Sequence, residues 1–248
     1  MISIFRKKEY LIDHLEGIID IHNHILPGID DGAQNVEESI GLLEKFRDLG
    51  ITKFIATPHI MNDYYPNTPE TINTALSHLN KEINENKKLR NTEIQFAAEY
   101  MMDQHFLELM KSEKLLTLKD NMVLVEMSYF QAPINLNDIL FKLQTNGYKP
   151  VLAHPERYAF YHAKDLSKYE DLKNRGCLFQ LNTLSLTPHY GSNMQKTAYK
   201  LLENKMIDFI GSDTHRVQHI EKISKIIIER KAKQSLLTII SNTKENFS

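Results

Sequence analysis

The stretch Ile18-Ile19-Asp20-Ile21-His22-Asn23-His24 joins an apolar, β-branched run to two histidines that are separated by one residue. In a strand, successive side chains point to opposite faces, so His22 and His24 project from the same face. Neutral imidazole is a common metal ligand, and the pair therefore indicates part of a metal site. On its own the motif is weak evidence for a metal site. In a chain of 248 residues with 11 histidines, the expected number of H-x-H motifs by chance is about one half. Its interpretation depends on what the rest of the chain brings to the same place.

Length and composition restrict the class of protein. The chain has 248 residues, of which 42% are hydrophobic and 25% charged, enough to bury a large core in one domain. We expect a single domain over residues 1–248, with its core at about 18–230, a short N-terminal extension and a polar C-terminal tail, although two smaller domains remain possible. A net charge of -2 and the lack of a dense Lys/Arg stripe argue against nucleic acid as the main ligand.

The single cysteine, Cys177, rules out an internal disulfide and fits a reducing compartment. The first ten residues lack the apolar core of a signal peptide, and no run approaches the length of a membrane span. These features predict a soluble, cytoplasmic protein without a membrane span. They leave the oligomeric state open.

Apolar, β-branched runs alternate with amphipathic stretches along the chain. Asn35 with Glu38 forms a capping pair before one expected helix, which Gly50 ends, and Pro69 occupies a favourable first helical position. The final helix is expected from about Gln218, and residues 242–248 are expected to fray. The expected strands are 18–21, 53–56, 94–98, 122–125, 150–153, 177–181 and 207–211, and the other expected helices are 68–89, 103–111, 137–146, 165–174 and 192–204.

Strands and helices that alternate seven times predict parallel strands with right-handed crossovers, either in a closed barrel or in an open doubly wound sheet. No Gly-rich phosphate loop follows an early strand, which weakens the open-sheet interpretation. A barrel requires its functional groups to lie at the C-terminal ends of several strands. The next feature of the chain meets that requirement.

Acidic and imidazole side chains follow six of the seven expected strands. A lone histidine or glutamate at a strand end is more often solvated or hydrogen-bonded, but six such ends together predict a metal site at one mouth. The sixth strand offers only Asn182 and Thr183. The groups in chain order are His22, His24, Asp30 and Asp31; His59; Glu99; Glu126; His154, Glu156 and Arg157; and Asp213 and His215.

The motifs resemble the polymerase-and-histidinol-phosphatase (PHP) family, and more narrowly its bacterial tyrosine-phosphatase branch, which is encoded with capsule and exopolysaccharide genes. The resemblance covers about residues 18–216 and implies the PHP fold, an α/β distorted (β/α)7 TIM-like barrel with a trinuclear metal centre. The matching segments are His22-x-His24, Leu26-Pro27-Gly28-Ile29-Asp30-Asp31-Gly32, Ala56-Thr57-Pro58-His59, Ala98-Glu99-Tyr100, Val125-Glu126-Met127, Leu152-Ala153-His154-Pro155-Glu156-Arg157-Tyr158 and Gly211-Ser212-Asp213-Thr214-His215.

The resemblance also implies how the ligands are divided among three metals. Mixed carboxylate and imidazole ligands suit Mn²⁺, Fe or Zn²⁺ better than Ca²⁺, and the resemblance favours Mn²⁺. Asp31 is favoured over Asp30 because it precedes Gly32, and Asp20 is expected to orient a ligand imidazole. The implied groups are His22, His24, Glu99 and Asp213; Glu99, Glu126 and His154; and His59, His215 and Asp31.

Such a centre suits phosphate chemistry. A metal-bound water has its pKa lowered toward ~7, so that hydroxide can attack phosphorus directly without a phosphoenzyme. Arg157 can grip two phosphoryl oxygens, although it is alternatively a surface ion-pair partner of Glu156. Arg216 is a second candidate for substrate binding, because the position of the branch's other arginine falls on Ile220 here.

The leaving group places modest demands on the site. A phenolate, with a pKa of ~10, requires only a weak acid, for which Asp31, His59 and His215 are candidates. Several aromatic residues lie just beyond strand ends, where they either flank a bound aromatic ring or pack the loops: Tyr64, Tyr65, Tyr129, Phe130 and Tyr158. Of these, Tyr129 is predicted to contact the substrate. Cysteine-based chemistry is excluded because no arginine follows Cys177 closely, and Cys177 is expected in the core.

The sequence therefore predicts a metal-dependent phosphotyrosine phosphatase. The resemblance implies a bacterial tyrosine kinase of capsular or exopolysaccharide synthesis, dephosphorylated on its tail, as the partner. The alternatives are a small-molecule phosphomonoesterase similar to histidinol phosphatase, and a non-catalytic metal-binding regulatory module.

Overall fold

The computed structural model describes residues 8–162 and 165–248 and contains two parallel sheets. All strand pairs within the sheets are parallel, as the alternating pattern predicts. The first sheet has the order β1 (Ile19–Asp20), β2 (Lys53–Ala56) and β4 (Glu93–Phe96). The second has the order β3 (His59–Ile60), β5 (Glu99–Met101), β6 (Met122–Glu126), β7 (Lys149–Ala153), β8 (Leu178–Asn182) and β9 (Phe209–Gly211).

The expected strand 53–56 is confirmed as β2, and the expected strand 94–98 corresponds to β4, which ends at Phe96. Each is followed by a further short strand that the sequence did not predict, β3 after Thr57-Pro58 and β5 after Ala97-Ala98. Proline has no N–H to donate to a ladder, which explains the interruption at Pro58. Backbone hydrogen bonds still run across the breaks, from Ala97 N to the oxygen of Ala56 and from Glu99 N to the oxygen of Pro58. The two sheets are therefore neighbouring parts of one parallel array.

The far edges of the two sheets also meet. Asp213 N donates to the oxygen of His22 at 2.7 Å, and His24 N donates to the oxygen of Thr214 at 3.0 Å. The α/β prediction is confirmed, but the strands of the described residues form two adjoining parallel sheets instead of one closed barrel. This arrangement brings the C-terminal ends of the first and last strands together.

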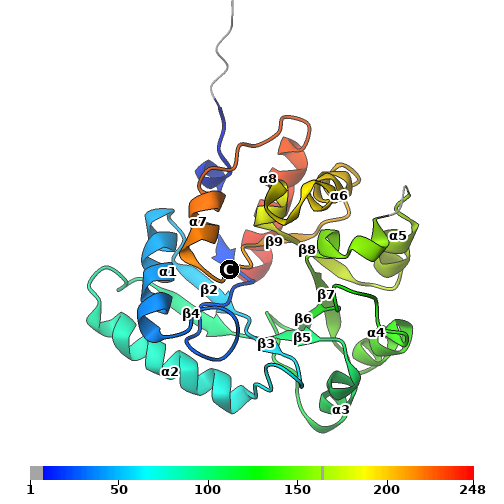
Figure 1. Cartoon of the computed structure of the whole chain (residues 1–248), viewed down its shortest axis with the longest axis horizontal. Coiled ribbons are helices and arrows are strands. Elements are labelled where there is room, and N and C mark those ends of the chain that lie inside the picture. Colours follow the sequence, from blue (N-terminus) through cyan, green and yellow to red (C-terminus); the bar gives the residue numbers. More distant parts are fainter. Residues whose placement is uncertain (1–7, 163–164) are drawn as a thin grey trace, which may run out of the picture.

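Eight α-helices surround the strands in the described parts of the chain (Figure 1). The expected cap is confirmed, since the Asn35 side chain accepts from Glu38 N at 2.9 Å. The helices are α1 (Val36–Asp48), α2 (Pro69–Glu85), α3 (Gln104–Ser112), α4 (Leu136–Thr145), α5 (Ser167–Asn174), α6 (Ser192–Glu203), α7 (Val217–Ile223) and α8 (Lys233–Phe247); short 3-10 turns are η1 (Leu11–His14), η2 (Pro155–Arg157), η3 (Ala159–Tyr161), η4 (Thr183–Leu186) and η5 (Pro188–Tyr190).

The C-terminal end differs from the prediction in two ways. The single helix expected from Gln218 is divided into α7 and α8, and residues 242–247 are helical rather than frayed. Phe247 is buried and packs edge-on against Phe209 with ring centroids 5.0 Å apart. The end of the chain is held because this ring enters the apolar interior, and the C-terminus lies near the centre of Figure 1.

The interior between the strands forms an apolar cluster separate from the larger core under the helices. Ile21, Ile55, Leu124 and Val151 belong to it, and Phe247 joins it from the N-terminal side of the strands. Filled interiors of this kind leave the C-terminal strand ends as the place for chemistry. None of the helices in residues 8–162 and 165–248 combines the length and apolar character needed to cross a bilayer.

Candidate metal centre

All nine predicted ligands converge on the C-terminal side of the strands. Parallel pairing sends every strand end to the same side, and loops directly after the strands carry the remaining groups. Every one except Asp31, His59 and His215 is fully buried. His22 and His24 follow β1, Asp31 precedes α1, His59 begins β3, Glu99 begins β5, Glu126 ends β6, His154 follows β7, and Asp213 and His215 follow β9.

The first predicted group is assembled around two carboxylate oxygens. Glu99 Oε2 lies 3.2 Å from His22 Nε2 and 3.6 Å from His24 Nε2. Asp213 Oδ1 lies 3.5 Å from His22 Nε2 and 3.3 Å from His24 Nε2. The four side chains thus direct nitrogen and oxygen atoms at one shared space, the geometry required around a cation.

The second predicted group is divided in the structure: Glu99 and Glu126 lie in one set with His59, whereas His154 lies in another with His22 and Asp213. His154 Nε2 is 3.0 Å from Glu99 Oε1, as the shared role of Glu99 predicts. Glu126 Oε1, however, lies 2.8 Å from His59 Nδ1, and Glu99 Oε2 is 3.1 Å from the same nitrogen. His59 therefore stands between the second and third groups.

The third group distinguishes the two neighbouring aspartates. Asp31 Oδ1 lies 3.5 Å from His59 Nε2 and 3.3 Å from His215 Nε2. Asp30 is instead occupied, because it accepts from His24 Nδ1 at 2.8 Å and from the backbone N–H of Gly32 at 2.9 Å. The geometry therefore favours Asp31 as the candidate ligand and gives Asp30 an orienting role.

Several of the converging atoms are buried without a hydrogen-bond partner. They include nitrogens of His22, His24 and His59 and carboxylate oxygens of Glu99 and Glu126. Burying unpaired polar atoms is costly and uncommon, so each requires an explanation. Mixed imidazole and carboxylate atoms within 4.8 Å of one another form several overlapping sets that suit divalent metal ions. The donor set fits the predicted metals.

The histidine rings are held with their metal-facing nitrogens directed inward. His22 Nδ1 donates to Gln180 Oε1 at 2.7 Å, and His215 Nδ1 donates to the oxygen of Asp213 at 3.0 Å. Together with the Asp30 contact to His24, these acceptors fix the proton on Nδ1 and leave Nε2 as a lone-pair donor. Such orientation is typical of metal-ligating histidines.

The predicted role of Asp20 is wrong. Its carboxylate accepts from Ser212 N at 2.8 Å and from Ser212 Oγ at 2.6 Å, and so it fixes the loop before Asp213. Gln180 provides the orienting contact to His22 instead. The sequence offered one signal for it, since Gln180 is the polar residue between Phe179 and Leu181 in an otherwise apolar strand.

The backbone is strained at two of the candidate ligands. His154 has φ 37° and Asp213 has φ 50°, in the left-handed region that side chains other than glycine seldom adopt. Close approach also explains two glycines: a Cβ on Gly32 would lie 2.1 Å from the oxygen of His24, and one on Gly211 would lie 2.8 Å from His22 Cβ. The backbone therefore adopts locally unfavourable conformations and close contacts where these ligands come together.

Opposite charges dominate the electrostatics of the cluster. Burial alone would raise the pKa of Glu99, but His22 and His59 lower that pKa well below its usual range. Burial alone would lower the pKa of His59, but Glu126 and Glu99 raise it to about 9. Glu99 therefore remains charged despite burial, and its negative charge attracts cations.

Arg157 lies beside the cluster and points toward Asp213. Its Nη1 donates to Asp213 Oδ2 at 2.6 Å, and its guanidinium carbon lies 4.7 Å from the Tyr129 ring centre and 4.1 Å from that of Tyr190. The side chain is held by a charged hydrogen bond and two cation–π contacts. The alternative ion pair with Glu156 is wrong, because Glu156 is buried and accepts from Asn182 N at 3.0 Å.

Tyr190 and Asn182 also belong to the site, although the sequence did not predict them there. Asn182 Nδ2 donates to Asp213 Oδ2 at 2.7 Å and to the Tyr190 hydroxyl at 3.1 Å. Asn182 ends β8, where a polar residue was visible, but Tyr190 is brought in by the turn η5 and has no sequence signal.

The cluster opens into a cavity of about 870 Å³. Asp31, His59, Arg157 and His215 line it, as does the predicted substrate contact Tyr129. Arg216 does not line this cavity; it is exposed at the start of α7. The structure therefore gives Arg157 but not Arg216 a place beside the cluster.

A parallel α/β array whose strand ends gather imidazoles and carboxylates around an open cavity is typical of metal-dependent hydrolases. The family model described as "Capsular polysaccharide synthesis, CpsB/CapC" matches residues 18–246. The chain belongs to this family.

Relatives and a solved structure agree with that assignment. The chain is 34% identical to the tyrosine-protein phosphatase YwqE of Bacillus subtilis and 32% identical to the putative tyrosine-protein phosphatase CapC of Staphylococcus aureus, each over 81% of this chain and 78% of the relative. A crystal structure from work on YwqE and Streptococcus pneumoniae CpsB, described as unique metal-dependent tyrosine phosphatases, superposes with a TM-score of 0.79 at 27% identity, covering 93% of this chain and 94% of that one. A Listeria monocytogenes lactonase shares the fold alone, with a TM-score of 0.56, 11% identity and 95% coverage of both chains.

Proposed function

We propose that this protein is a metal-dependent phosphatase that hydrolyses phosphotyrosine on proteins. The observation that carries the proposal is a buried set of unpaired imidazole and carboxylate atoms, with Arg157 beside it on the same cavity. The similarity to the tyrosine-protein phosphatase YwqE and the putative tyrosine-protein phosphatase CapC supports the same substrate class.

Three Mn²⁺ ions are the proposed cofactors, although the ligand chemistry also suits Fe or Zn²⁺. When bound, such ions lower the pKa of water and stabilise charge on the attacking and leaving oxygens. His59 would face both the second and the third ion. The proposed ligands are His22, His24, Glu99 and Asp213 for the first, Glu99, Glu126 and His154 for the second, and Asp31, His59 and His215 for the third.

The protein's own side chains would bind and orient the phosphoester. Arg157 is already directed by Asp213, Tyr129 and Tyr190, so its planar fork can bind phosphoryl oxygens with little loss of side-chain freedom. Tyr129 would lie beside the substrate ring. Asp31, His59 and His215 line the same cavity and are the proposed sources of a proton for the departing phenolate.

We further propose an autophosphorylated tyrosine kinase of capsular or exopolysaccharide synthesis as the partner. The family description supports a link to capsular polysaccharide synthesis, and the relatives' names support a phosphoprotein substrate. Such a kinase uses ATP, which would place this phosphatase in the cytoplasm.

The test compares phosphoesters and two arginine variants. Purified protein with Mn²⁺ should hydrolyse a tyrosine-phosphorylated peptide with a higher kcat/KM than histidinol phosphate. Arg157→Ala should lower kcat/KM on the peptide by about 100-fold, because a preorganised donor to the developing charge is lost. Arg216→Ala is the matched control, since that arginine lies outside the cavity, and it should change the rate less than twofold.

Two results would contradict the proposal. Preference for histidinol phosphate would indicate a small-molecule phosphatase. Bound Mn²⁺ without hydrolysis of either ester would indicate a non-catalytic metal-binding module.

A further inference from the structure

Exposed large apolar side chains are concentrated at the mouth of the candidate active site. In the described parts of the chain six such residues are exposed, and four of them line the 870 Å³ cavity: Tyr64, Tyr129, Phe130 and Ile134. Ile134 is fully exposed and Phe130 is 93% exposed. Single exposed apolar residues are ordinary, but a group around one opening indicates an interaction surface.

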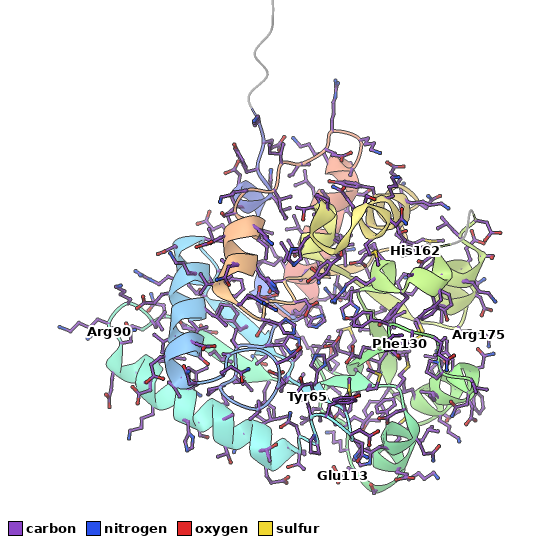
Figure 2. All side chains as sticks on the ribbon, in the orientation of Figure 1. Tyr65, Arg90, Glu113, Phe130, His162 and Arg175 are labelled. Atoms are coloured by element: carbon purple, nitrogen blue, oxygen red, sulfur yellow. The ribbon has the colours of Figure 1, made fainter. Side chains whose placement is uncertain are left out.

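The outer apolar residues form two walls, which together we call the lip: Met61, Tyr64 and Tyr65 on one side, and Phe130 and Ile134 on the other. The first wall lies between β3 and α2, and the second between β6 and α4. Figure 2 labels Tyr65 and Phe130, one from each wall, near the middle of the view. Because both walls line one cavity, a ligand held in the centre would extend between them.

Local hydrogen bonds hold the lip in shape. Tyr65 N donates to the oxygen of Met61 at 2.7 Å, and the ring of Tyr65 stacks on His59 with centroids 5.6 Å apart. This turn leaves the intervening Tyr64 74% exposed. On the opposite wall, Phe130 N donates to Ser128 Oγ at 3.3 Å. The apolar groups are thus presented outward from fixed loops.

The charges around the lip restrict the partner. Asp63 and Asp103 line the outer part of the cavity, whereas its one lysine or arginine, Arg157, is paired with Asp213 at the inner end. Acidic side chains near the lip would be repelled, because complementary potentials favour correct partners and like charges suppress wrong ones. An apolar segment avoids this repulsion and covers the exposed rings.

We propose that the lip binds an extended peptide whose residues on either side of the phosphotyrosine are apolar or aromatic rather than acidic. This inference rests on the proposed function. The lip is continuous with the cavity that would hold the phosphotyrosine, so one peptide chain can occupy both. A second copy of the protein seated on the lip would cover the entrance to that cavity.

The experiment uses the full chain with Mn²⁺ and three substrates: a phosphotyrosine peptide flanked by leucine and tyrosine, the same peptide flanked by glutamate, and p-nitrophenyl phosphate. The wild type should prefer the apolar peptide by about tenfold in kcat/KM, the effect of partly burying one or two large side chains. The double variant Phe130→Ala, Ile134→Ala should lose this preference through a higher KM, with kcat retained. Its hydrolysis of p-nitrophenyl phosphate should change less than twofold.

Phe141→Ala provides the matched control, because Phe141 is also an exposed ring, at 63%, but lies outside the cavity. It should leave all three reactions unchanged. Equal rates on the two peptides, or an equal loss in Phe141→Ala, would overturn the inference while leaving the phosphatase proposal intact. A wild-type dimer that the double variant converts to a monomer with unchanged peptide kinetics would also overturn it. If no phosphotyrosine peptide were hydrolysed, the proposed function itself would be contradicted.

Discussion

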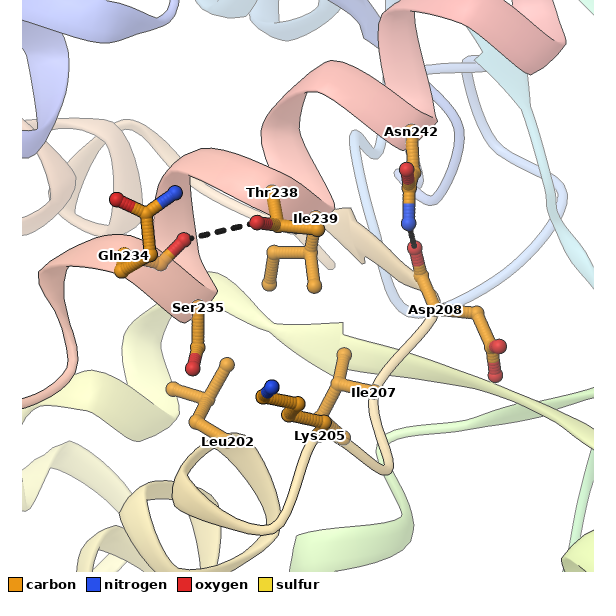
Figure 3. A pocket seen from close by; sticks show the side chains of 9 residues that line it. All are labelled: Leu202, Lys205, Ile207, Asp208, Gln234, Ser235, Thr238, Ile239 and Asn242. Atoms are coloured by element: carbon orange, nitrogen blue, oxygen red, sulfur yellow. Dashed lines mark hydrogen bonds between the residues drawn. The ribbon is translucent and has the colours of Figure 1, made fainter.

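The two ends of the strand array carry cavities of opposite character. The cavity at the C-terminal strand ends has a floor of buried nitrogen and oxygen atoms without hydrogen-bond partners. At the N-terminal ends, a cavity of about 430 Å³ lies between α6, α8 and the residues before β9 (Figure 3). None of the nine residues drawn there has a buried side-chain polar atom without a partner.

Asp208 in the second cavity illustrates the difference. Its carboxylate accepts from Lys173 and from Phe179 N. Figure 3 shows the third contact, in which its backbone oxygen accepts from the Asn242 side chain. Glu99 at the opposite end has an oxygen that lacks a hydrogen-bond partner, although three histidines surround it. A fully satisfied polar group serves stability, whereas an unsatisfied one that the fold maintains indicates function. Substitutions at the two ends should therefore have opposite consequences.

The largest effect is expected from Glu99→Gln. The amide keeps the shape of the side chain but removes the charge that would hold two ions, so kcat should fall by more than about 1,000-fold. Metal content measured on the purified variant should fall with it. Glu93→Gln is the control, since Glu93 is exposed on β4 and pairs only with Lys53 in the described chain. Activity within tenfold of the wild type in Glu99→Gln would break the comparison.

Phe247→Ala should have the reverse effect. Removing this ring from the apolar interior should lower the free energy of unfolding by about 3 kcal/mol, since the cavity beside Phe209 cannot fully collapse. Urea denaturation measures the loss, and kcat/KM of the folded variant should remain at the wild-type value. If the free energy of unfolding fell by less than about 1 kcal/mol, the packing of Phe247 would not stabilise the N-terminal end of the strand array. Phe141→Ala, on the exposed side of α4, should change stability by less than 0.5 kcal/mol.

The sequence predicts the candidate ligands better than it predicts the residues that orient them. His22 and His24 are recognisable because the strand period places them on one face, and parallel strands must send their ends to one side. Gln180 is recognisable as a polar residue within the expected sixth strand, but that signal does not show that its amide contacts His22. Tyr190 comes from a turn whose path depends on packing, so no local signal predicts its contact with Arg157.

The C-terminal helix shows the same limit for the fold. Leu236, Ile239, Ile240 and Phe247 follow helical spacing, but the intervening polar residues suggest a solvated tail. The helix is kept because Phe247 fills the end of the strand array, a tertiary contact that propensity does not encode. The short strands β3 and β5 are a related case, since Pro58 marks an interruption but the pairing of the residues beyond it depends on neighbouring strands.

Gln180→Ala tests whether the supports at the mouth matter for the ions. Without the acceptor for His22 Nδ1, the ring loses its fixed orientation, and Mn²⁺ affinity should fall by about 10- to 100-fold. The Mn²⁺ concentration for half-maximal activity measures this shift, and saturating Mn²⁺ should restore most of the rate. Gln218→Ala, an exposed residue in α7, is the control. If Gln180→Ala left the Mn²⁺ dependence unchanged, the residues that orient the ligands would not contribute to metal binding, and only the ligands themselves would matter.

The smallest effect is expected at Cys177, which lies immediately before β8 at the stable end of the array. The thiol is 2% exposed, and burial raises its pKa to about 12. At pH 8 only about one molecule in 10⁴ would carry the reactive thiolate, so iodoacetamide should not label the native protein within an hour. Phe247→Ala should allow labelling, because it raises the population of opened molecules, whereas Glu99→Gln should not. Labelling is measured by mass spectrometry. Rapid labelling of the wild type would show that the N-terminal strand ends open even with Phe247 in place. The two ends of the array would then differ less than their packing indicates.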